Sequence, residues 1–147
     1  MKIQKAKKED LRKYLKIKRE SLKEYSKMSG CKINLTDNQI KKELIESINN
    51  PKKFTLLIGD GEIAGYLIGS IIISEHKSYG YIDDIFIYRK FRGHGLGTDL
   101  IKEFIKILKH KKINKLRLGV NINNKKAIKL YERLGFKLKH YEMDKEL

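Results

Sequence analysis

Arg92-Gly93-His94-Gly95-Leu96-Gly97-Thr98 is the stretch that decides the fold, because three alternating glycines stand where a strand must become a helix. An apolar, strand-like run over 81–88 precedes it, and a strongly periodic helical run over 99–109 follows it. Glycine permits positive φ angles and lets another molecule approach the backbone closely. The first amides of a helix lack internal partners and lie at the positive end of its dipole, so we predict an anion site here. The glycines alone would also fit an ordinary tight connection.

Outward from this turn, the apolar patterns predict one mixed α/β domain over residues 1–147. Helices are expected from Asp10 to Met28, after the capping box Thr36-Asp37-Asn38-Gln39, over 99–109 and over 125–134. Strands are expected over 1–5, 54–58, 63–74, 79–88 and 116–120, with final candidates over 136–140 and 141–146. The order predicts a mixed, mostly antiparallel sheet flanked by helices, with one late crossover.

The composition indicates a globular protein with a net charge of +16, from 34 Lys and Arg against 18 Asp and Glu. The lysines are spread over every segment and are not interleaved with aromatic residues, so we do not expect nucleic-acid binding as the main function. No apolar run is long enough to span a membrane, the N-terminus does not resemble a signal peptide, and the single Cys31 excludes an internal disulfide. We expect a cytoplasmic protein and leave a homodimer open.

Two motifs then carry a family resemblance. Arg92-x-x-Gly95-x-Gly97 resembles the R-x-x-G-x-G/A segment of the GCN5-related N-acetyltransferases. The later segment Asn124-x-x-Ala127-x-x-x-Tyr131-Glu132-x-x-Gly135-Phe136 resembles the second motif of that family, in the same order and at about the same spacing. The resemblance is specific over 81–136 and implies the fold of that family, acetyl-coenzyme A as co-substrate, and an amine acceptor.

The resemblance also implies where the co-substrate binds. Its pyrophosphate would lie on Arg92 and the amides of the glycine turn, and its pantetheine arm along the preceding strand, which splays from the strand over 116–120. The residues implied are Ile85, Phe86, Ile87, Arg92, Gly93, His94, Gly95, Leu96, Gly97, Thr98, Asn124, Ala127 and Tyr131. Asn124 could equally cap the helix that follows it.

Three residues are candidates for the chemistry. The resemblance makes Tyr131 the general acid for the departing sulfur, although its apolar neighbours also suit a core residue. Asp83 and Asp84 are costly in an apolar strand unless they are paired or solvated. At most one should face the reaction cleft, because neighbouring strand residues face opposite sides unless a bulge intervenes. We prefer Asp83 as the base or acceptor-binding acid, and a salt bridge to a lysine is the alternative.

The acceptor is the least determined part. By the resemblance, Glu24, Tyr25, Glu20 and the loop to Leu35 shape its pocket. We expect a primary amine on a small, polyamine-like molecule. Protein N-termini or lysines are one alternative, and an RNA- or ribosome-binding module on an inactive scaffold is another. His76, His110 and His140 form no metal-ligand spacing with Cys31, so we expect no metal and direct transfer without a covalent enzyme intermediate.

Overall fold

The computed structural model describes residues 1–75, 77–143 and 145, in which five strands form one sheet in the order β1-β2-β3-β4-β5. The strands are β1 (Lys2–Lys5), β2 (Lys53–Asp60), β3 (Glu62–Ile73), β4 (Ser78–Ile87) and β5 (Leu116–Leu118). The first four pair antiparallel, and β5 pairs parallel with β4. The predicted mixed, mostly antiparallel sheet with a late crossover is confirmed.

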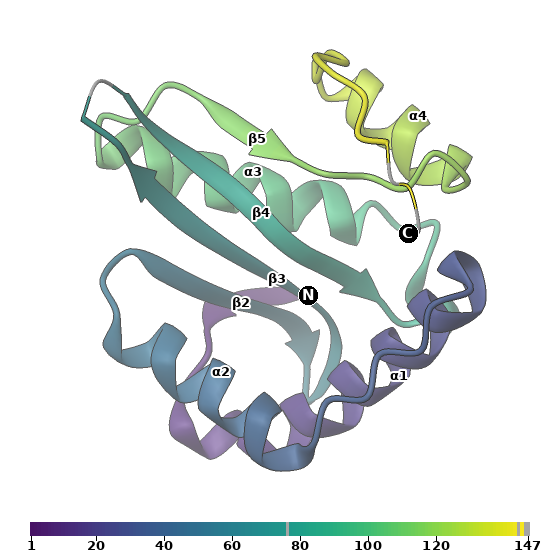
Figure 1. Ribbon diagram of the computed structural model, residues 1–147. Helices are drawn as coiled ribbons and strands as arrows, with labels where there is room; N and C mark the ends of the chain where they lie inside the picture. Colours follow the sequence, from purple (N-terminus) through teal and green to yellow (C-terminus); the bar gives the residue numbers. More distant parts are fainter. Residues whose placement is uncertain (76, 144, 146–147) are drawn as a thin grey trace.

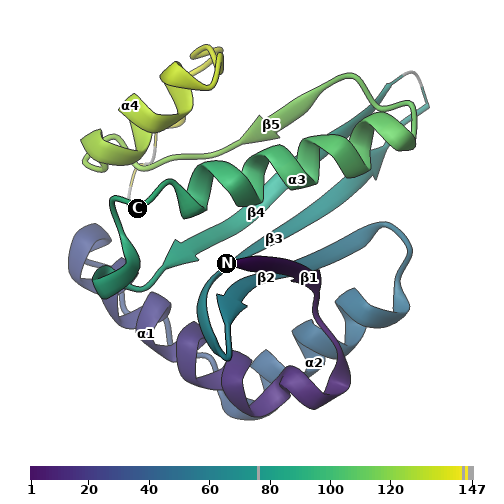
Figure 2. The same ribbon diagram turned by 180° about the vertical axis from the view of Figure 1, so that it is seen from behind.

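Helices cover both faces of the sheet (Figures 1 and 2). Two of them, α1 (Leu11–Ser29) and α2 (Asp37–Asn49), lie on one face. The crossover helix α3 (Leu96–His110) lies on the other, and α4 (Lys125–Arg133) follows β5. Short 3-10 turns occupy Lys8–Asp10 and Arg89–Phe91.

The predicted capping box of α2 is confirmed, whereas Asp10 stands at the N-cap of α1 without a side-chain cap bond. Gln39 N donates to Thr36 Oγ1 at 3.3 Å, and Thr36 N donates to Gln39 Oε1 at 2.8 Å, which is the capping box of α2. Gly30 ends α1 in the left-handed region, with φ of 76°. The helix α3 begins at Leu96, three residues before the expected Asp99, because Gly95 rather than a side chain occupies its N-cap.

The sheet separates two apolar cores. The core beneath α3 contains Leu100, Phe104 and Leu108 of that helix. The core beneath α1 and α2 contains Tyr14 and Tyr66 among its buried side chains. Because helices cover both faces of the central strands, the sequences of β2 and β3 are continuously apolar and do not alternate between apolar and polar residues.

The two predicted final strands are wrong over the residues that can be described. Residues 136–143 and 145 contain no strand, while Asp144 and Glu146 lie outside the described part of the chain. The side chains of Leu138, Tyr141 and Met143 are 70%, 75% and 90% exposed. An alternating pattern becomes a strand only where a pairing edge is offered, and the neighbouring β5 is only three residues long.

Gly69 is required by close packing against α3. A Cβ added there would lie 2.5 Å from Cζ of the buried Phe104 ring. We predict that Gly69→Ala lowers the free energy of unfolding by about 1–3 kcal/mol, measured by urea denaturation, because the ring must move. In a Phe104→Leu background the same substitution should cost clearly less. An equal cost in both backgrounds would contradict the steric explanation.

Candidate functional site

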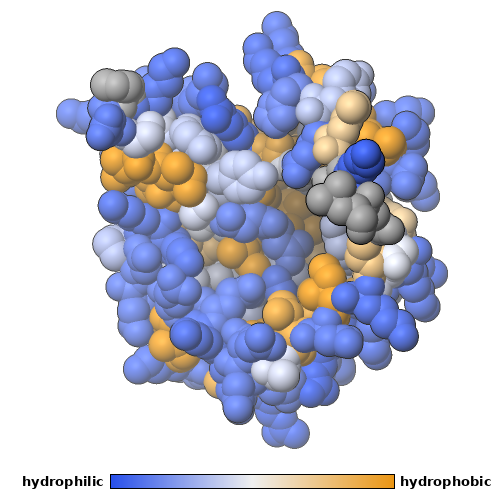
Figure 3. Space-filling model, viewed as in Figure 1, coloured by the Kyte–Doolittle hydropathy of each residue, from blue (hydrophilic) through white to orange (hydrophobic). Residues whose placement is uncertain are grey.

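The pairing between β4 and β5 ends halfway along β4. Its last partners are Ile82 and Leu118, so the segment Asp84–Ile87 pairs on one side only, with β3. Figure 3 shows the surface hollowed between this part of β4 and the chain that leads from β5 to α4, with apolar residues on the floor. The second half of β4 therefore has one unpaired edge, because β5 diverges from it. This is the splay that the family resemblance implied.

The alternating hydrogen bonds between β3 and β4 show which main-chain groups of β4 face the open edge. Tyr88 N donates to Ala64 O of β3 at 2.9 Å. Since antiparallel pairing turns alternate residues toward the same neighbour, the amides of Ile85 and Ile87 face the open edge. The edge thus offers main-chain groups to an extended, amide-bearing ligand.

A β-bulge in β4 controls which way the two aspartates face. Ile68 pairs with Asp84 while Gly69 pairs with Ile82, so Asp83 is an extra residue without a partner on β3. On one side of the bulge, Ile82 joins the core beneath α3, and on the other side Phe86 joins the core beneath α1 and α2. The reversal turns Asp83 and Asp84 to the same face, that of α1 and α2.

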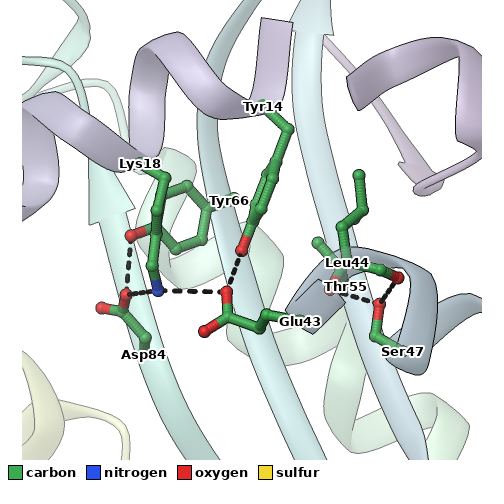
Figure 4. Close-up of polar contacts among 8 residues, drawn as sticks. All are labelled: Tyr14, Lys18, Glu43, Leu44, Ser47, Thr55, Tyr66 and Asp84. Carbon is green, nitrogen blue, oxygen red and sulfur yellow. Dashed lines mark hydrogen bonds and ion pairs between the residues drawn. The ribbon is translucent and has the colours of Figure 1, made fainter. Parts of the chain in front are cut away.

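Asp84 belongs to a network that ties β4 to both of those helices (Figure 4). Its Oδ2 accepts from Lys18 Nζ at 2.8 Å and from the Tyr66 hydroxyl at 2.6 Å. Lys18 Nζ also lies 3.4 Å from Glu43 Oε1, and that carboxylate accepts a hydrogen bond from the Tyr14 hydroxyl. The alternative of a salt bridge to a lysine is therefore correct for Asp84.

Sequence reasoning missed Lys18, Glu43, Tyr14 and Tyr66. One signal was available, because Lys18 stands four residues after Tyr14 on the buried stripe of α1, where a solvated lysine is not expected. Nothing in the sequence placed Glu43 or Tyr66 opposite it.

Asp83 has a different environment. Its side chain reaches the surface, and no ion pair to it occurs within the described residues. Partial burial raises the pKa of the Asp83 carboxyl, and a hydrogen bond from the Ser70 hydroxyl partly offsets that rise. A carboxylate with a raised pKa is better suited to accept a proton than one held in a salt bridge.

The glycine turn leaves the first amides of α3 free. Gly95, at φ of 77°, is the N-cap and supplies no side chain, and Asp99 N makes the first bond back to Gly95 O, at 3.0 Å. Within the part of the chain that the structure describes, the amides of Leu96, Gly97 and Thr98 have no hydrogen-bond partner. A Cβ on Gly97 would lie 3.9 Å from side-chain atoms of Ile87 and Leu130, so this glycine borders the hollow.

Arg92 is bonded to groups of β4 and α1. Its Nη2 donates to Glu24 Oε2 at 2.7 Å, and its Nε donates to Ile87 O at 2.8 Å. The guanidinium also lies 5.3 Å from the centre of the Phe86 ring. The sequence assigned Arg92 to the anion and Glu24 to the acceptor, whereas here their charges neutralise each other. His94 is exposed, with Nδ1 3.3 Å from Phe91 O.

Tyr131, on α4, is a buried member of the core beneath α3, as its apolar neighbours in the sequence suggested. Its side chain is 8% exposed and packs edge-on against Phe136, with ring centres 5.7 Å apart. Burial, and then the negative charge of Asp84, raise the pKa of its phenol. The phenol therefore stays protonated at neutral pH and can donate a hydrogen bond.

The other candidates have structural roles or lie at the rim. Asn124 caps α4, because its Oδ1 accepts from Ala127 N at 3.2 Å. Ala127 packs against the core beneath α3, and Tyr25 on α1 is 43% exposed. The described residues hold no group of three His, Cys, Asp or Glu side chains placed to bind a metal ion.

The sequence that forms this site matches a known protein family. A model of the "Acetyltransferase (GNAT) family" matches residues 19–136. The chain belongs to the GNAT family. Among the helices described, none is long and apolar enough to cross a membrane.

Curated relatives differ in the acceptor that their names state. A thialysine N-epsilon-acetyltransferase from Mus musculus is 40% identical over 55 residues, which are 37% of this chain and 32% of that protein. An N-alpha-acetyltransferase from Sulfurisphaera tokodaii is 33% identical over 100 residues, which are 59% of this chain and 60% of that protein. The chain therefore spans less than two thirds of the length of these relatives.

The fold has a solved counterpart. A tetramutant of the BH1408 protein from Bacillus halodurans superposes with a TM-score of 0.85 at 19% identity, covering 100% of both chains. At that identity the likeness concerns the fold alone.

The cap at Asn124 gives a stability prediction. Asn124→Ala should lower the free energy of unfolding by about 1 kcal/mol, because the Ala127 amide loses its partner at the start of α4. Chemical denaturation measures this, and Asn123→Ala is the matched control, since its side chain caps nothing in the described structure. Equal losses in the two variants would remove the capping role.

Proposed function

We propose that the protein transfers an acetyl group from acetyl-coenzyme A directly to a primary amine. One observation carries the proposal: the open edge of β4 joins the free amides of α3 to the aspartates at the bulge. An anionic, amide-bearing thioester and a cationic amine would then meet along one strand, each at the end that suits its charge.

The residues present fit the co-substrate. The amides of Gly93 to Thr98 would bind the pyrophosphate, and the Ile85 carbonyl and the Ile87 amide at the open edge would pair with the pantetheine arm. The Ile87 carbonyl is already bonded by Arg92, so the arm would pair with the remaining groups. The thioester supplies an activated acetyl group with a thiolate as its leaving group.

The chain's residues would assist three events of the transfer. The amine nitrogen forms a bond to the thioester carbon while the carbon–sulfur bond breaks, the amine loses a proton, and the sulfur gains one. Asp83 accepts the amine proton directly or through water, because its carboxylate is partly desolvated and forms no ion pair among the described residues. The amide of Ile85 donates to the developing oxyanion.

Tyr131 would donate to the departing sulfur. A thiol has a pKa of about 8.5, below that of a phenol at about 10, so full proton transfer is uphill. Burial raises the pKa of Tyr131 further. We therefore assign to Tyr131 a hydrogen bond that stabilises the departing thiolate. The thiolate takes up its proton later, when water enters the site.

A small amine is the acceptor that we favour, since three carboxylates, Glu43, Asp83 and Asp84, lie on one face of the sheet and only one ammonium, that of Lys18, pairs with them among the described residues. Acetylation of protein N-termini is the second candidate. The match to the N-alpha-acetyltransferase supports it, because that alignment runs over 100 residues.

Acetyl-coenzyme A should raise the melting temperature of the protein. Ligand at a hundred times its dissociation constant would add about 2.7 kcal/mol of stability. Gly97→Leu should abolish the shift by filling the hollow between Ile87 and Leu130, while the control Gly61→Asn, in the distant β2–β3 turn, should retain it. No shift for the native protein would rule out the co-substrate.

Tyr131→Phe should lower kcat by about a hundredfold and leave the KM for acetyl-coenzyme A nearly unchanged, because only the transition state loses a hydrogen bond. The assay follows release of the free thiol with an amine acceptor in excess. Tyr141→Phe, at a side chain that is 75% exposed, is the control and should behave as the native protein. An unchanged kcat in Tyr131→Phe would exclude the donor role.

A further inference from the structure

The acceptor side of the site already contains an ammonium group of the protein itself. Lys18 is 4% exposed, and its Nζ lies 2.8 Å from Asp84 Oδ2 and 3.4 Å from Glu43 Oε1. The same nitrogen lies 5.4 Å from the centre of the Tyr66 ring. Two carboxylates and an aromatic face are the groups with which proteins bind a foreign ammonium.

The other groups around Lys18 complete that arrangement. The hydroxyl of Tyr14 donates to Glu43 and the hydroxyl of Tyr66 donates to Asp84, so both carboxylates are held in place by buried phenols. Figure 4 shows Lys18 lying between the two carboxylates, with the second oxygen of Asp84 turned away from it. No hydrogen bond to that second oxygen, Oδ1, occurs among the described residues.

The carboxylates next to Lys18 are neutralised to a different extent in the interior and toward the surface. Inside, its ammonium is shared by Glu43 and Asp84. Toward the surface, Asp83 has no ion pair in the described structure, and Asp84 Oδ1 is free, so negative charge remains at the bulge. A cationic acceptor is therefore attracted to the bulge and finds the inner position filled.

We propose that Lys18 is a specificity-determining residue, a resident ammonium that limits the acceptor to one cationic group at the bulge. This rests on the proposed amine acetylation and narrows it. A second ammonium two to five carbons away on the same acceptor would compete with Lys18 for Glu43 and Asp84. The site then binds one ammonium group of the acceptor and gains little affinity from a second ammonium in a compact diamine.

Amine binding without acetyl-coenzyme A tests the inference separately from catalysis. Propylamine and 1,3-diaminopropane are titrated calorimetrically into the native protein, into Lys18→Met and into Lys16→Met. Lys16 is exposed on the same helix, so its variant loses the same charge without emptying the inner position. In the native protein and in Lys16→Met, the diamine should bind no more than about threefold more tightly than propylamine, because the inner position is closed. In Lys18→Met it should bind at least about tenfold more tightly.

Two results would overturn the inference: a native protein that binds the diamine tenfold more tightly than propylamine, or a folded Lys18→Met variant with the native ratio. If circular dichroism shows that Lys18→Met does not fold, the double variant Lys18→Met/Glu43→Gln replaces it. That variant leaves Asp84 without its ammonium partner, so the same tenfold preference for the diamine is expected. In either case, the ratio of the two affinities in the native protein tests the inference by itself. Failure of amine acetylation with unchanged binding ratios would count against the proposed function alone.

Discussion

An extra residue in β4, Asp83, separates the half of the strand that pairs with β5 from the half that does not. A bulge costs a strand part of its ladder and reverses the faces of every residue beyond it. Here the reversal places Asp84 against Lys18 and Tyr66, and Phe86 in the core beneath α1 and α2. The bulge thus places both aspartates on one face and lies where the pairing with β5 ends.

The two ends of the open edge are linked by side chains from distant parts of the chain. Arg92 joins the start of the glycine turn to Glu24 on α1, and Lys18 on the same helix joins Asp84. The helix α1 therefore contacts both the glycine turn and the bulge of β4. Only the Lys18–Asp84 pair is shielded from water, since the side chains of Arg92 and Glu24 are 43% and 28% exposed, so the pair at Lys18 contributes more to holding α1 in place.

Much of this could be predicted from the sequence, because local chemistry determines it. The helix caps at Thr36 and Gly30, the buried stripe of α3 and the free amides after Gly95 follow from residue type and spacing. The bulge could not be predicted, because register depends on the partner strand. Nor could the pairing of Arg92 with Glu24, which are 68 residues apart. The failed final strands have the same cause, since an alternating pattern such as that around Leu138 does not say whether an edge is available.

Amide hydrogen exchange, followed residue by residue with and without acetyl-coenzyme A, tests most directly whether the open edge and the glycine turn form one binding site. The amides of Leu96, Gly97 and Thr98, which are unpartnered in the described structure, should gain protection together with those of Ile85 and Ile87. The amides of Tyr88 and Asp99, which are already bonded, should change little. Saturating ligand that protects neither Leu96–Thr98 nor the edge of β4 would contradict the site described here.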